Sequence, residues 1–268
     1  MNQVYDFKRI VLLARLKFSL HKKALTLSVL GYFALLFIVG FFIAYANRNH
    51  PYNVHFFTTF HYISLSIMMV LGSIVLASRA FQDMNTPEKA ITQILIPAST
   101  FEKYLLPLIS TSLIWFVFSF LTYHIFSLLF NCIWVCSFGY DFQIFNGFNI
   151  FNIPWLFEII LSYILLHSIF ILGAAAFRKY PIVKTVLAMQ VLNWAYTILG
   201  IIVIIILFGS MDNFGNYMNH MDHSVFPIER FDPVKFEAQG RLLLKLLMVI
   251  FTGAFYVTAY YKLKEREV

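Results

Sequence analysis

Residues 24–46 read ALTLSVLGYFALLFIVGFFIAYA, an uncharged and almost wholly apolar run. A helix needs about 20 such residues to cross the hydrocarbon core of a bilayer, so this run is long enough to span a membrane. It is also longer than the ~7–15 apolar residues of a secretory signal peptide. We therefore interpret it as a retained transmembrane helix.

Similar apolar blocks occur along the chain at roughly 56–78, 104–135, 155–177, 182–209 and 242–261. Over all 268 residues, 60% belong to the hydrophobic set and only 12% are charged, whereas soluble domains carry about 25% charged residues. The blocks do not alternate apolar and polar residues, which excludes the strands of a membrane β-barrel. The sequence predicts an all-α membrane protein with six transmembrane helices, built as a single domain over residues 1–268.

Basic residues between the blocks predict the orientation. Fifteen lie in the leader, in the connection 79–103, in the short turn before the fifth block and in the C-terminal tail, whereas five lie on the other side. Lys and Arg are retained on the cytoplasmic side of a membrane, so both termini are expected in the cytoplasm. This distribution accounts for the formal net charge of +7 without a nucleic-acid partner.

The leader, residues 1–23, is predicted to be an amphipathic interfacial helix. Phe7, Ile10, Ala14 and Phe18 share one stripe, and Lys8, Arg15 and Lys22 recur along its flank. A helix with this pattern lies in the membrane surface and contacts both lipid and the bundle. The alternative is a charged lead-in that only sets the orientation.

The connection 79–103 is patterned as a short amphipathic helix between two turns. Thr86 is a suitable N-cap, Pro87 fits the first helical position, and Glu88 complements the helix dipole. Ser99 and Glu102 have the spacing of a capping box that begins the next helix. One face of the predicted helix is apolar and the other polar: Ala90, Ile91, Ile94 and Leu95 against Glu88, Lys89, Thr92 and Gln93. Such a helix requires a partner, either a protein or the membrane surface.

In layout the chain resembles the permease subunits of the ABC type-2 exporter family, and the residue-level likeness lies in segment 85–103, NTPEKAITQILIPASTFEK. Similar bacterial permeases carry here an acidic residue, an apolar stretch, Leu-Pro-x-Ser and a basic residue. Glu88, residues 94–97, Ser99 and Lys103 match that order. The resemblance implies a coupling helix that docks on a separate cytoplasmic ABC ATPase. The contacts it implies are Thr86, Pro87, Glu88, Lys89, Ile91, Ile94, Leu95, Ser99 and Glu102.

The resemblance further implies that two permeases, identical or paralogous, pair in the bacterial cytoplasmic (inner) membrane. Members of this family often carry short apolar re-entrant helices between the fifth and sixth spans. Residues 210–240 depart from that pattern, because they are polar and rich in Asp, Asn and His. We expect them to form an extracytoplasmic loop.

The chain carries no G-x-x-x-x-G-K-[ST] phosphate loop and no hydrolase signature, so we expect no enzyme activity and no cofactor in it. ATP and Mg²⁺ belong to the expected partner. The predicted function is ATP-driven export of a lipid-like, amphiphilic or peptide cargo. Two alternatives stay open: a non-transporting membrane scaffold that recruits a cytoplasmic partner, and an ATP-independent secondary transporter. The latter would need buried carboxylates, and Glu158 is the single candidate within the blocks.

Polar residues inside the blocks are candidates for a substrate route, because they are costly in lipid and usually face protein or water. These residues are His124, His167, Gln190 and Asn193. The alternative for each is a hydrogen bond that only fixes helix packing. No metal site is expected. Residues 219–223, NHMDH, supply suitable ligand types, but they lie in a polar loop without a further ligand.

Overall fold

The computed structural model describes residues 6–46, 54–85, 91, 95–138, 144–152, 156–210 and 233–267. Within them every regular element is a helix, and six helices are long and apolar enough to cross a membrane. The prediction of six spans is therefore confirmed by length and composition. The elements are α1 Phe7–Ala46, α2 Val54–Ser78, η1 Gln82–Met84, α4 Thr100–Ile109, η2 Ser110–Ile114, α5 Trp115–Phe138, η3 Gly147–Asn152, α6 Leu156–Ala176, α7 Pro181–Phe208 and α9 Pro233–Glu267.

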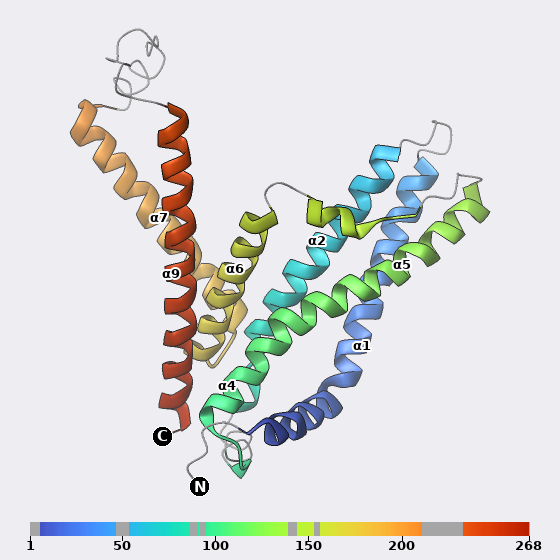
Figure 1. The fold of residues 1–268 in the computed structure, drawn as a ribbon, viewed down its shortest axis with the longest axis horizontal. Helices are drawn as coiled ribbons and strands as arrows, with labels where there is room; N and C mark the ends of the chain where they lie inside the picture. The colour runs from blue at the N-terminus through green and yellow to red at the C-terminus, as the bar shows by residue number, and fades with distance from the viewer. Residues whose placement is uncertain are drawn as a thin grey trace.

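The leader and the first span form one helix. α1 continues without interruption from Phe7 to Ala46, because no proline lies in it and its first glycine is Gly31. Figure 1 shows the N-terminal section of α1 crossing beneath the bundle before the helix turns upward beside α5. From Phe7 onward the leader is thus helical as predicted, but no break separates it from the span.

The third span is interrupted by a π-turn. Pro107 lies inside α4 and has no backbone N–H, so it cannot donate the usual helical hydrogen bond to the carbonyl four residues before it. The π-helical residues Ser110–Ile114 come directly after α4, and α5 resumes at Trp115. The continuous helical stretch from Thr100 to Ser137 has 38 residues. At 1.5 Å per residue it is about 57 Å long, so it must tilt or protrude from a ~30 Å hydrocarbon core.

The fourth and fifth spans form a close hairpin. Pro181 is the first residue of α7, as its position in the sequence predicts, and Tyr180 before it has a positive φ of 53°. A Cβ atom at Gly173 of α6 would overlap the side chain of Thr185 of α7. Gly173 is therefore required for the approach of the two helices.

The buried side chains form two clusters. The first lies between α1, α2 and α5 and is rich in aromatic residues, among them Trp115, Tyr123, Phe130 and Trp134. The second lies between α2, α4, α6 and α9 and is centred on Ile171. α6 contacts α2, α7 and α9, whereas the span of α7 contributes little to either cluster: none of its most apolar window is buried (Figure 1).

Candidate functional site

The connection between α2 and α4 meets the N-terminal section of α1 at the end of the bundle where α9 also ends (Figure 1). The predicted capping box begins α4 here. Ser99 Oγ accepts a hydrogen bond from the Glu102 backbone N–H at 3.2 Å, and Glu102 Oε2 accepts one from the Ser99 backbone N–H at 2.8 Å. The predicted capping box is therefore confirmed as the start of α4.

Glu102 also binds the leader. Its side chain is fully buried, and Oε1 accepts a hydrogen bond from the backbone N–H of Asp6 at 2.6 Å. The guanidinium of Arg9 lies 3.1 Å from the same oxygen, and Arg9 Nε lies 3.9 Å from Asp6. One carboxylate thus joins the start of α1 to the start of α4 and compensates a mostly buried arginine charge.

The sequence places Ser99 and Glu102 among the contacts to a partner. In the structure both side chains bind within the chain, so they hold the segment in place. Ile91 and Leu95 are exposed, by 60% and 76%, and both are helical. Thr86, Pro87, Glu88, Lys89 and Ile94 lie outside the described residues. Of the predicted apolar contacts, the described part of the chain therefore exposes two, Ile91 and Leu95.

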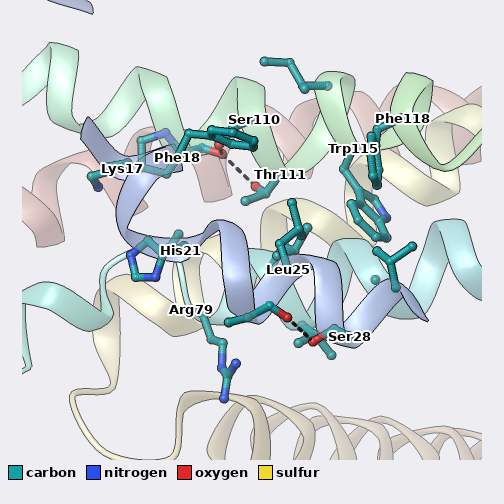
Figure 2. Close-up of a pocket in the computed structure, with 18 of the residues that line it drawn as sticks. Lys17, Phe18, His21, Leu25, Ser28, Arg79, Ser110, Thr111, Trp115 and Phe118 are labelled. Carbon is teal, nitrogen blue, oxygen red and sulfur yellow. Dashed lines mark hydrogen bonds between the residues drawn. The ribbon is translucent and has the colours of Figure 1, made fainter. Parts of the chain in front are cut away.

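A cavity of about 600 Å³ lies beside this junction, between α1, the end of α2 and the α4–η2 turn. Figure 2 shows Lys17, His21 and Arg79 on one side of it and Trp115 with Phe118 at the opposite end. The Trp115 indole donates a hydrogen bond to the carbonyl of Met69 at 3.2 Å, which fixes the ring against α2. The cavity therefore has a charged end and an aromatic end.

The four polar residues predicted along a substrate route do not come together. His167 is buried, with Nε2 2.8 Å from Thr111 Oγ1 and Nδ1 2.9 Å from the Tyr256 hydroxyl. It therefore connects η2, α6 and α9.

His124 acts at the other end of the bundle. Its Nδ1 lies 2.7 Å from the Phe120 carbonyl, and its Nε2 accepts a hydrogen bond from the Gly147 backbone N–H at 3.2 Å. It thereby holds η3 against α5. Gln190 and Asn193 lie on the exposed surface of α7. The two histidines make the packing hydrogen bonds that were the alternative interpretation of the sequence.

Two residues that make these contacts between helices were not predicted from the sequence. Arg9 is one of many basic residues in the leader, and the sequence carries no signal of its pairing with a glutamate so far along the chain. Tyr256 lies in the last apolar block, and in the sequence nothing distinguishes it from the other aromatic residues of a membrane span. Both are recognised only once the helices are placed in space.

Within the described residues, no group of three or more His, Cys, Asp or Glu side chains is arranged to hold a metal ion. Residues 219–223, the candidate ligands of the outer loop, lie outside that part of the chain. Comparison with protein-family models, with curated proteins and with solved structures finds no match to this chain.

Proposed function

We propose that this chain is the membrane-spanning subunit of an ATP-driven exporter that works with a separate cytoplasmic ABC ATPase. The observation that carries the proposal is the Arg9–Glu102 link at the base of the connection 79–103. A connection whose described part exposes the apolar side chains of Ile91 and Leu95 suits docking of a protein, and its attachment to two spans suits the transmission of force.

The proposed mechanism is mechanical. Closure of the ATPase pair on ATP pushes on the connection between α2 and α4. Because Glu102 belongs to the first turn of α4 and also binds Asp6 and Arg9, that displacement reaches the third span and the leader together. The leader lies at the membrane interface, both termini face the cytoplasm of a bacterium, and two permeases pair to frame the route.

The surface of the bundle supports pairing. The spans of α1, α7 and α9 are largely unburied in the single chain, and α7 exposes Gln190 and Asn193. Amide side chains of membrane helices ordinarily hydrogen-bond to a neighbouring helix. A second permease, identical or paralogous, would supply such a neighbour. The apolar and aromatic spans favour a lipid-like, amphiphilic or peptide cargo.

The described carboxylates disfavour an ion-coupled secondary transporter. Glu102 is buried but bound to Arg9, and Glu158 lies 2.7 Å from Lys245 with 40% of its side chain exposed. Coupling to protons or sodium ordinarily uses an acidic group that faces the transport route. A scaffold that recruits a partner without transport needs the same docking surface as the exporter.

Copurification tests the docking. The tagged chain is purified from membranes of its own host, and captured proteins are identified by mass spectrometry and assayed for ATP hydrolysis. We expect a phosphate-loop ATPase with the wild type, and its loss with the double variant Ile91→Asp/Leu95→Asp. The control is Tyr180→Asp, which changes a 75% exposed aromatic residue in the α6–α7 turn. Capture that persists in the double variant contradicts the docking role.

Transport separates the exporter from the scaffold. Reconstituted with the captured ATPase, an exporter moves amphiphile between leaflets or compartments on addition of ATP, and it loses this activity in Ile91→Asp/Leu95→Asp. A scaffold captures the partner but moves nothing.

A further inference from the structure

The cavity between α1, α2 and η2 has the two kinds of surface that an amphiphile requires. Its walls are mostly apolar, and Trp115 with Phe118 closes the end away from the charges (Figure 2). At about 600 Å³ it falls within the ~300–1,000 Å³ range of ligand-binding sites. A polar solute would leave most of this wall without a partner.

The cavity is accessible from the bilayer side. Three of its wall residues on α2 belong to a membrane-spanning helix and remain more than 40% exposed: Ile67, Leu71 and Val75. Ile114 on the third span is 54% exposed in the same wall. A hydrocarbon chain can therefore enter from the membrane without passing through water.

The charged end is basic. Its basic residues are Lys17, Lys22 and Arg79, and Asp83, which attracts Lys17, is the carboxylate among the lining residues. His21 Nε2 lies 3.9 Å from the carboxylate of Asp83. Within the described part of the chain, neither Lys17 nor Arg79 lies within 4 Å of a carboxylate oxygen, and the single lining carboxylate, Asp83, does not balance the three basic residues. A basic pocket between spans at a membrane surface suits a phospholipid headgroup.

We propose that this cavity binds one anionic phospholipid, with an acyl chain along the apolar wall and the phosphate near Lys17 and Arg79. The site needs no ATPase and no transport. Its test therefore uses this chain alone, and its failure would leave the docking of the ATPase untouched.

Native mass spectrometry of the full chain in neutral detergent provides the measurement. The protein is titrated with phosphatidylglycerol or phosphatidylcholine of identical acyl chains. We expect tighter binding of phosphatidylglycerol. We expect that preference to fall about fivefold in Lys17→Gln and about 30-fold in Lys17→Gln/Arg79→Gln, as one basic charge near a headgroup contributes ~1 kcal/mol. The control is Lys23→Gln, an exposed leader lysine outside the cavity, which should keep the preference.

A second pair of variants tests the acyl chain. Val75→Trp places an indole in the cavity and should weaken both lipids, whereas Ile63→Trp adds the same bulk to an exposed position of α2 outside it. Equal binding of the two lipids by the wild type overturns the proposal. So does a Lys23→Gln effect as large as that of Lys17→Gln, or unchanged binding in Val75→Trp. Melting temperatures confirm that each variant compared is folded.

Discussion

The guanidinium of Arg9 lies 3.1 Å from the carboxylate of Glu102, and thereby the first helix of the chain is attached to the start of its third span. The carboxylate is fully buried and 21% of the arginine side chain is exposed. Removing one member of a buried ion pair leaves the other charge uncompensated. The pair is therefore sensitive to substitution on either side.

We predict that Arg9→Gln and Glu102→Gln each lower the free energy of unfolding by about 3 kcal/mol. The double variant should lose less than the sum of the two, because neither charge remains buried alone. Melting of the purified protein in detergent, followed by tryptophan fluorescence, gives the comparison. Lys8→Gln, an exposed leader position, is the control. Strict additivity of the two substitutions would show that the pair does not interact.

Substitutions at His167 and Tyr256 should lower the free energy of unfolding by less than those at Arg9 and Glu102. Tyr256→Phe removes the hydroxyl that lies 2.9 Å from His167 Nδ1 and leaves the ring in place. Hydrogen bonds between membrane helices contribute about 0.6 kcal/mol on average. We expect a loss of that size in Tyr256→Phe and about 1 kcal/mol in His167→Leu, which also loses the contact with Thr111. If Tyr256→Phe destabilises equally in the presence and absence of His167, the two side chains are not coupled.

Two helical glycines predict opposite outcomes for the same substitution. At Gly173 a Cβ would overlap Thr185, so Gly173→Ala should destabilise the hairpin by about 1–3 kcal/mol. At Gly200 the added Cβ meets no atom within 4 Å beyond the backbone of its own helical turns and its chain neighbours, so Gly200→Ala should raise the stability by up to ~1 kcal/mol. Thermal unfolding of the two variants side by side provides the check. A stabilising Gly173→Ala would contradict the packing of α6 on α7.

Cysteine labelling tests the orientation. Leu95 and Tyr180 are expected on the cytoplasmic side and Ile144 outside, and all three are more than 70% exposed. Each is changed to Cys in a chain whose Cys132 and Cys136 are replaced by Ala. An impermeant maleimide added to intact cells should label Ile144→Cys, and should label the other two only after lysis. The reverse pattern would place the connection 79–103 outside and end its proposed contact with a cytoplasmic ATPase.

The sequence predicted those features that depend on neighbouring residues. The six apolar blocks and the Ser99–Glu102 capping box each arise from local composition or spacing.

Features that depend on tertiary placement were not predicted. The Arg9–Glu102 pair and the His167–Tyr256 contact join residues far apart in the chain, and local patterns carry no information on such pairing. The cavity arises from three helices whose individual patterns are those of ordinary spans. Polar residues inside a span indicate a substrate route when only the sequence is considered. In the structure, however, His167 uses both ring nitrogens to hold neighbouring helices.

The π-turn at Ser110–Ile114 lets one span serve two different neighbours. Tyr104 and Trp115 are 11 positions apart, and in a regular α-helix they would point in directions within about 20° of each other. The extra residue of a π-turn rotates the helix beyond it relative to the helix before it. Tyr104 donates a hydrogen bond to the Tyr256 carbonyl of α9, whereas Trp115 donates one to the Met69 carbonyl of α2. If Ser110–Ile114 instead continued as regular α-helix with no residue removed, both rings would align along a single stripe, and one of the two helices would lose its aromatic neighbour.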